Sequence, residues 1–147
     1  MNYLKSYIGI DPGVSGGIAA FNSNGELIFW GRFPYEHEMP NYEVINGIVK
    51  GLNPEFVAIE KQFNNAVALV NEGFLKGILI QLANIVSVHS RTWQARFKLK
   101  GDKITHVQYV ETNFVSLSAF KNKEQKHGVA DAVLIAKWCY DKYAKKE

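Results

Sequence analysis

The stretch IGIDPGVSGGIAAF, residues 8–21, decides the expected fold, because it joins two short apolar runs through a tight turn. The first run, residues 7–10, is closed by Asp11-Pro-Gly, and the second, residues 16–21, is closed by Asn22-Ser-Asn-Gly25. Apolar runs of this length bounded by Pro, Gly and Asn are typical of β-strands joined by turns. The stretch therefore predicts a β-hairpin whose first strand ends in a carboxylate.

Beyond this hairpin, the apolar patterns predict an alternation of strands and helices. The helix expected at 66–83 is apolar on almost every side, so it is either central or part of a subunit interface. The order of elements predicts one mixed α/β domain spanning residues 1–147. The other expected elements are strands at 26–33, 56–60 and 85–89, and helices at 41–50, 92–97, 102–113 and 129–143.

The composition is that of an ordinary globular chain of 147 residues, with 47% hydrophobic and 21% charged residues. A chain of this length can bury about two thirds of its unfolded surface, and its composition excludes collagen-like, disordered and coiled-coil proteins. The single cysteine, Cys139, cannot form an internal disulfide, which fits a reducing compartment. Because no apolar run has the length of a signal peptide or a membrane span, we expect a soluble cytoplasmic protein, in a bacterial or phage-infected cell, with no membrane partner.

Charge is unevenly distributed along the chain. Residues 1–60 carry three Lys and Arg against seven Asp and Glu, whereas residues 61–147 carry fourteen against seven. The densest basic stretch, residues 91–103, also holds Trp93 and Phe97, a mixture that suits phosphate contact combined with base stacking. A solvated basic face is the alternative. The candidate DNA-binding residues in this stretch are Arg91, Arg96, Lys98 and Lys100.

Three acids stand in apolar surroundings: Asp11 and Glu60 each end an expected strand, and Asp131 lies in the run HGVADAVLIA. Each has a structural alternative alone, as a turn opener, a surface partner of Lys61 or a favourable charge near a helix start. Together they favour a site for a divalent cation, because clustered carboxylates repel unless a cation lies between them. Oxygen ligands suit Mg²⁺ or Mn²⁺ rather than Zn²⁺. His127, four residues before Asp131, would share a helix face with it if the last helix already includes it; a helix-capping or solvent-facing histidine is the alternative.

These acids lie in three blocks, IGIDPGVSGGIAAF, VAIEKQF and KHGVADAVLIAKW, which resemble in order and spacing the motif blocks of RuvC-type Holliday junction resolvases. They are most similar to the short versions carried by phages. The resemblance implies a ribonuclease H-like fold, a mixed five-stranded sheet flanked by helices, and a homodimer. It also implies metal-dependent cleavage of two symmetric strands in a four-way DNA junction, leaving 5′-phosphate and 3′-hydroxyl ends.

The resemblance also assigns roles to individual residues. Asp11, Glu60 and Asp131 fall on the family's metal-binding acids, which implies two Mg²⁺ or Mn²⁺ ions per site. Many members have a fourth acid three residues before the last one. That position is Gly128 here, so His127 is the candidate fourth ligand. The resemblance places Lys103 near the scissile phosphate and Phe63 against bases at the crossover.

Other functions remain open from the sequence. An ATP-dependent phosphotransferase could use the Asp11 hairpin to hold phosphates, but 147 residues are too few for a second nucleotide-binding lobe. We therefore expect no nucleotide cofactor. A non-catalytic junction- or RNA-binding module and a related nuclease acting on RNA–DNA hybrids or other branched DNA are the remaining alternatives.

Overall fold

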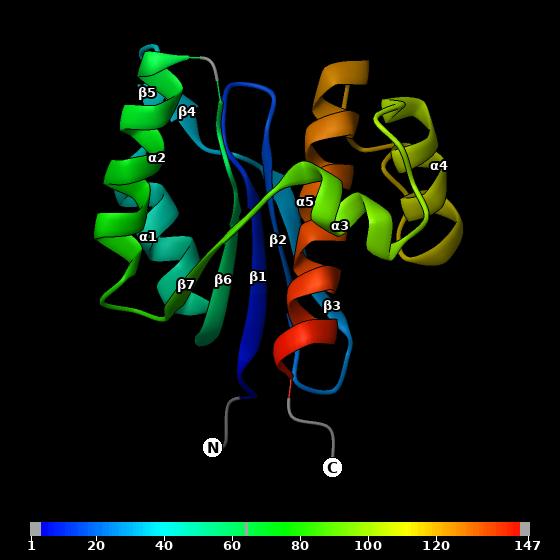
Figure 1. The fold of residues 1–147 in the computed structure, drawn as a ribbon, viewed down its shortest axis with the longest axis horizontal. Helices are drawn as coiled ribbons and strands as arrows, with labels where there is room; N and C mark the ends of the chain where they lie inside the picture. Colours follow the sequence, from blue (N-terminus) through cyan, green and yellow to red (C-terminus); the bar gives the residue numbers. More distant parts are fainter. Residues whose placement is uncertain (1–3, 64, 145–147) are drawn as a thin grey trace.

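A five-stranded mixed sheet forms the centre of the computed structural model, which describes residues 4–63 and 65–144 (Figure 1). The strand order is β3-β2-β1-β6-β7. The first three strands are antiparallel, and β1, β6 and β7 run parallel. The five strands expected from the sequence and the mixed α/β class are confirmed. Their bounds are β1 Ser6–Asp11, β2 Gly17–Asn22, β3 Leu27–Arg32, β6 Pro54–Glu60 and β7 Asn84–Val88.

Helices cover both faces of this sheet (Figure 1). Alternate side chains of β1, β2 and β6 point to opposite faces, so they form two cores. One face packs against α1 (Tyr42–Gly51) and α2 (Ala66–Leu79). The other packs against α3 (Ser90–Arg96), α4 (Lys103–Asn113) and α5 (Lys123–Tyr143).

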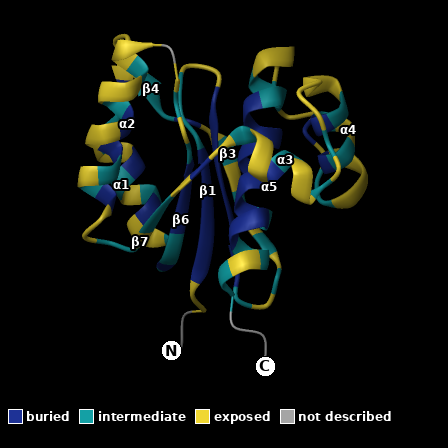
Figure 2. Cartoon of the chain, in the orientation of Figure 1, coloured by how far each residue is buried: buried dark blue, intermediate teal, exposed yellow. Residues whose placement is uncertain are grey.

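The helix α5 lies unusually close to the sheet because small residues line the contact. A Cβ atom added to Gly9 would overlap the backbone of Ala136, and one added to Gly17 would lie 2.7 Å from the carbonyl oxygen of Gly128. Gly128, Ala132 and Ala136 are spaced by four residues, so they fall on one helix face. The middle of α5 is consequently buried (Figure 2).

Two helix bounds differ by more than two residues from those expected. The last helix begins at Lys123 and not at 129, because the Asn122 side chain caps it by accepting a hydrogen bond from the Gln125 amide at 2.9 Å. Gly128, which precedes the expected helix start, lies inside α5. The apolar helix expected at 66–83 ends at Leu79.

The sequence prediction missed a small ribbon formed by β4 (Tyr35–Glu36) and β5 (Met39–Pro40). Its two-residue turn, His37 and Glu38, has positive φ at both positions, the geometry that favours Asn-Gly. Because neither residue is typical of such a turn, the local sequence carries no hairpin signal.

No helix in residues 4–63 and 65–144 is long and apolar enough to cross a membrane.

Candidate functional site

Two of the predicted acids meet at one end of the sheet because their strands are parallel neighbours. The register pairs Ile10 with Ile59, so Asp11 and Glu60 both follow at the carboxyl ends of β1 and β6. Asp131 reaches the same end from α5, which packs on β1, and is 3% exposed. The structure therefore brings together three side chains that lie far apart in the sequence.

The electrostatics of this cluster are those of crowded carboxylates. Burial, together with the negative charges of Glu60 and Asp131, raises the pKa of Asp11 well above its ordinary value of 3.8. Burial also raises the pKa of Glu60, with a further contribution from Asp131. Carboxylates in such an arrangement bind a cation or a proton more readily than isolated ones.

Two buried side chains hold the carboxylates in place. The Trp93 indole nitrogen donates to Glu60 Oε2 at 2.8 Å, and His106 Nδ1 lies 2.8 Å from Asp131 Oδ1. The two rings contact each other edge-on, with centroids 5.3 Å apart, so one buried pair supports two of the acids. The sequence prediction missed His106, and Trp93 was singled out only as a possible stacking residue.

The hydrogen-bond partners of His106 favour its protonated form. The second ring nitrogen, Nε2, contacts the carbonyl oxygen of Lys100, so both nitrogens face acceptors. Burial alone would lower the pKa of His106, but the hydrogen bond and charge of Asp131 raise it overall. The doubly protonated imidazolium satisfies both acceptors at once.

Lys103 places an ammonium group beside the same acids. Its Nζ lies 3.1 Å from Asp131 Oδ2, and the side chain is 55% exposed. Burial works to lower its pKa, yet the nearby carboxylates of Asp131, Asp11 and Glu60 raise it overall. Lys103 is the first residue of α4, and the Asp102 side chain caps that helix by accepting from the Ile104 amide at 3.2 Å. The predicted basic residue thus borders the carboxylates directly.

His127 and Gly128 lie in α5 one turn before Asp131. Because they are four residues apart, His127 and Asp131 share a helix face. Partial burial and the charge of Lys103 lower the pKa of His127, which favours the neutral imidazole that can ligate a metal. Gly128 packs against the carbonyl oxygen of Ser15 in the β1–β2 turn, so no side chain fits at this position without moving backbone.

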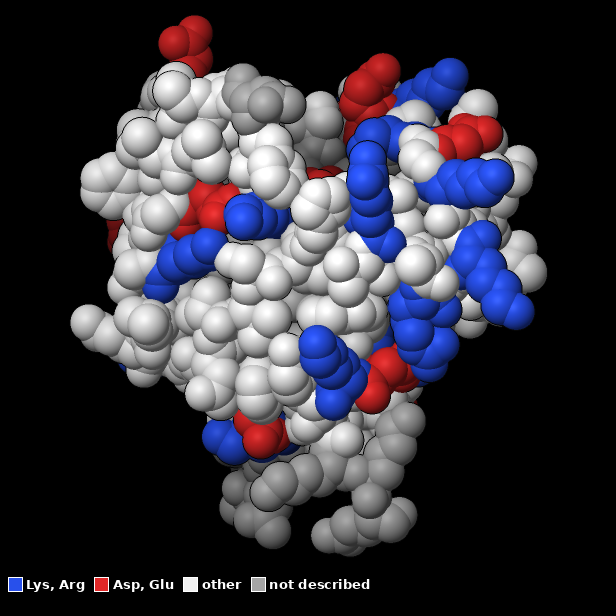
Figure 3. Space-filling view, viewed as in Figure 1, with Lys and Arg blue, Asp and Glu red and all other residues white. Residues whose placement is uncertain are grey.

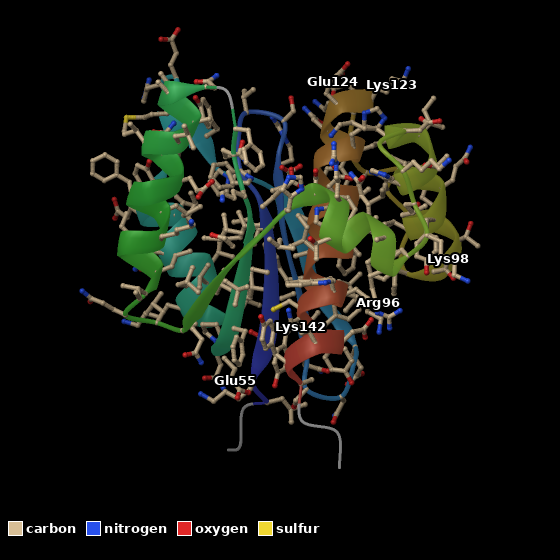
Figure 4. The ribbon with its side chains drawn as sticks, viewed as in Figure 1. Glu55, Arg96, Lys98, Lys123, Glu124 and Lys142 are labelled. Atoms are coloured by element: carbon tan, nitrogen blue, oxygen red, sulfur yellow. The ribbon has the colours of Figure 1, made fainter. Side chains whose placement is uncertain are left out.

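The candidate DNA contacts lie in two parts of the chain, after β6 and around α3. Phe63 follows β6, is 48% exposed, and its ring lies 5.0 Å from that of His89, with Lys61 Nζ 5.6 Å from its centroid. Lysine and arginine side chains gather over α3, α4 and α5 (Figure 3). Arg96 and Lys98 lie on that side, near the end of α3 (Figure 4).

The basic residues of this stretch have different partners. Arg96 pairs with Asp141 of α5 at 3.1 Å, so part of its charge is already compensated within the chain. Arg91, Lys98 and Lys100 are exposed.

Three carboxylates fit the oxygen ligation that Mg²⁺ and Mn²⁺ prefer. In the part of the chain that the structure describes, no three His, Cys, Asp or Glu side chains form a ready-made metal site. Existing hydrogen bonds are one reason why the acids do not form such a site. Lys103 and His106 each donate to one oxygen of Asp131, and Trp93 donates to one oxygen of Glu60. The three carboxylates fit a divalent cation when Lys103 Nζ releases Asp131 Oδ2.

The strand order and the flanking helices define a ribonuclease H-like fold. Thermus thermophilus RuvC, solved in complex with a Holliday junction substrate, superposes with a TM-score of 0.65 at 17% identity and covers 96% of this chain and 98% of its own. Fowlpox virus resolvase, solved with Holliday junction DNA, gives a TM-score of 0.65 at 12% identity and coverages of 95% and 99%. The fold implied by the sequence resemblance is thereby confirmed. No protein-family model matches the sequence, and neither does any curated protein.

Proposed function

We propose that the chain is a metal-dependent endonuclease that resolves four-way DNA junctions by paired, symmetric nicks leaving 5′-phosphate and 3′-hydroxyl ends. The observation that carries this proposal is the convergence of Asp11, Glu60 and Asp131 at one end of the sheet. It is supported by a fold shared along nearly the whole chain with proteins solved on Holliday junction DNA.

Asp11, Glu60 and Asp131 would hold Mg²⁺ or Mn²⁺, with His127 as a further ligand. When bound, a pair of such ions lowers the pKa of a water molecule and stabilises the leaving oxygen of a phosphodiester. Lys103 compensates the charge that develops on the phosphate, a role that its exposed position beside Asp131 allows. Trp93 and His106 fix the orientation of Glu60 and Asp131, as partners of metal ligands commonly do.

The remaining candidate residues would bind the substrate. Arg91, Lys98 and Lys100 are exposed and suit contacts with phosphates, which make affinity fall with rising salt. Phe63 is exposed beside the carboxylates and suits stacking on a base at the crossover. Arg96 would have to share its charge between a phosphate and Asp141.

The test is incubation of the protein with a labelled four-way junction, a matched duplex and an RNA–DNA hybrid, in Mg²⁺ and in Mn²⁺. We expect paired nicks at symmetric positions of the junction and an intact duplex. Nicking of the RNA strand alone would favour the related nuclease instead. Junction binding without cleavage in either metal would favour a non-catalytic binding module.

We further propose that the protein acts as a homodimer through the outer face of α2, because paired nicks need two active sites. The helix is not central: Leu75 and Leu79 are buried, but Val70 is 56% and Phe74 59% exposed. Val70, Gly73, Phe74, Gly77 and Ile78 line a shallow groove on this face. The two glycines would let a second helix approach closely.

Replacing Phe74 with Glu should convert a dimer into a monomer, because a charge would be buried in the apolar contact. Sedimentation mass measures the change. Ile28→Glu, at a similarly exposed apolar residue on β3, is the matched control and should leave the mass unchanged. A monomeric parent protein, or a dimer that survives Phe74→Glu, would exclude this interface.

The metal-free protein should lose stability as pH rises from about 4 towards neutral. The folded pKa of Asp11 is raised above its unfolded value, so the folded chain binds the extra proton and folding is favoured at low pH. Deprotonation at higher pH leaves crowded carboxylates, and Mn²⁺ should then restore stability. Melting temperatures of the parent and of Asp11→Asn, with and without Mn²⁺, measure this. The same pH slope in both proteins would exclude Asp11 as its source.

His127 should determine which metal supports cleavage. An imidazole is a softer ligand than a carboxylate, so the parent protein should favour Mn²⁺ over Mg²⁺. His127→Asp should raise Mg²⁺-supported cleavage relative to Mn²⁺, and His127→Ala should lower cleavage with both ions. The ratio of the two rates at fixed pH measures the effect. If His127→Ala leaves that ratio unchanged, His127 is not a ligand.

A further inference from the structure

Glu72 is a buried acid to which the proposed function gives no part. It lies in α2, a largely apolar helix, and is 7% exposed. Its Oε2 pairs with Lys76 Nζ at 2.6 Å, one turn further along the helix. A pair of this spacing also stabilises a helix when it is exposed, whereas burial of the charge costs desolvation free energy. Helix stability therefore does not explain why Glu72 is buried.

The other carboxylate oxygen of Glu72 binds the chain directly after β6. Oε1 accepts a hydrogen bond from the backbone amide of Gln62 at 2.6 Å, across ten positions of sequence. A hydrogen bond from an amide to an ionised carboxylate is shorter and stronger than one between neutral groups. The Gln62 side chain turns back and donates to the carbonyl oxygen of Glu60 at 2.9 Å. Glu72 thus holds a segment that begins at one of the proposed metal ligands.

The segment after β6 is fastened to two different elements. The Lys61 amide donates to the carbonyl oxygen of Val88 in β7 at 2.8 Å. The Gln62 amide donates to Glu72 of α2. Phe63 follows directly and is 48% exposed. Because Gln62 immediately precedes Phe63, its fixed amide limits the positions that the Phe63 backbone and ring can take.

We propose that Glu72 is a positioning residue for junction recognition: through the Gln62 amide it fixes the backbone from which Phe63 reaches the DNA. This inference rests on the proposed function, in which Phe63 stacks on a base at the crossover. A stacking side chain binds more tightly when its segment is ordered before binding, because ordering a mobile segment costs conformational entropy. Glu72 supplies this order in the free protein and, being buried, does not touch DNA itself.

Amide hydrogen exchange of the free protein tests the contact without DNA. Glu72→Leu should fold, since a buried ion pair can be replaced by an apolar side chain. The Gln62 amide then loses its acceptor and should exchange at least about tenfold faster than in the parent. Glu72→Gln keeps an acceptor oxygen and should restore most of the protection.

The Lys61 amide, which is bonded to β7, is the internal control for this measurement. It should stay equally protected in the parent and in both Glu72 variants. Unchanged exchange of Gln62 in Glu72→Leu would overturn the proposal. An equal acceleration at Lys61 would overturn it too, because Glu72 would then only stabilise this end of the sheet in general.

Binding to a four-way junction and to a matched duplex tests the consequence for recognition. Phe63→Ala should lower the preference for the junction about tenfold, the size of one base–aromatic contact, and Glu72→Leu about threefold or more. Glu72→Gln should keep the parent's preference. In a protein that already carries Phe63→Ala, adding Glu72→Leu should cause no further loss, because two residues that act through one contact are not additive.

Glu111→Leu is the matched control. Glu111 of α4 also accepts a hydrogen bond from a backbone amide, that of Leu117 at 3.2 Å, but α4 packs on the opposite face of the sheet from α2. This variant should keep the parent's junction preference.

An unchanged preference in Glu72→Leu would overturn this inference alone, provided that the parent prefers the junction. Equal losses from Glu72→Leu with and without Phe63, or the same loss in Glu111→Leu, would also overturn it. A parent that binds junction and duplex equally would overturn the proposed function, and this inference with it.

Discussion

Asp11→Asn is expected to abolish junction cleavage while leaving junction binding intact. The substitution keeps the shape of the side chain but removes the charge at the centre of the carboxylate cluster, where Glu60 and Asp131 both act on it. Loss of a partner that merely orients a metal ligand typically costs 10- to 100-fold in activity, so loss of a ligand should cost more than about 100-fold. Single-turnover cleavage of a labelled junction measures the rate, and a gel-shift titration measures binding.

The control for this variant is Glu43→Gln, which removes one negative charge from the exposed first turn of α1. It should cleave at the parent rate, because α1 packs on the sheet face opposite to α5. Cleavage by Asp11→Asn within a few-fold of the parent would show that the carboxylate cluster is not the active site. A parallel loss of binding would mean that Asp11 contacts DNA and does not act through a metal.

Much of the candidate site could be predicted from the sequence because strand ends are local signals. Asp11 and Glu60 each terminate an apolar run, and parallel neighbours necessarily bring such ends together. Asp131 was identifiable because an acid among HGVADAVLIA is costly to bury without a partner. The blocks around these acids also carried the family resemblance, and the fold that it implied is the fold observed.

The supporting residues could not be predicted in the same way. His106 lies in a helix whose sequence gives no sign of a buried histidine, and only the packing of α4 against α5 brings it to Asp131. In the sequence, Trp93 is one of two aromatic residues in a basic stretch, and only the position of α3 brings its indole nitrogen to Glu60. The partners in these two hydrogen bonds are 33 and 25 positions apart in the sequence, so the bonds leave no periodic pattern there. The β4–β5 ribbon was missed because its turn residues are atypical.

The packing around Gly128 gives a physical reason for the glycine at this position. From the sequence, glycine at this position is a departure from the family's fourth acid. In the structure the departure has a steric cause, since the β1–β2 turn approaches α5 so closely that Ser15 and Gly16 occupy the space of a side chain. The turn that positions Asp11 and the helix that positions Asp131 therefore meet at Gly128, so under the proposed function a fourth ligand would have to come from another residue. His127, one residue earlier on α5, is the side chain nearest in sequence.

Gly128→Asp is therefore expected to destabilise the protein strongly and not to improve catalysis, although it introduces the acid that many members of the family that the chain resembles have at this position. A Cβ atom at this position would overlap the Ser15 carbonyl and lie 2.8 Å from the Gly16 Cα, so backbone must move. Overpacking against backbone, with an added buried charge, should lower the free energy of unfolding by about 3 kcal/mol or more. Gly128→Ala should show most of this loss, because the Cβ atom alone causes the overlap. Urea denaturation measures both variants, and Gly47→Ala in α1, where no atom lies within 4 Å of the added methyl group, should gain up to about 1 kcal/mol. A Gly128→Asp protein as stable as the parent, with faster Mg²⁺-supported cleavage, would show that the helix and turn can separate and that the family's fourth ligand position is still usable here.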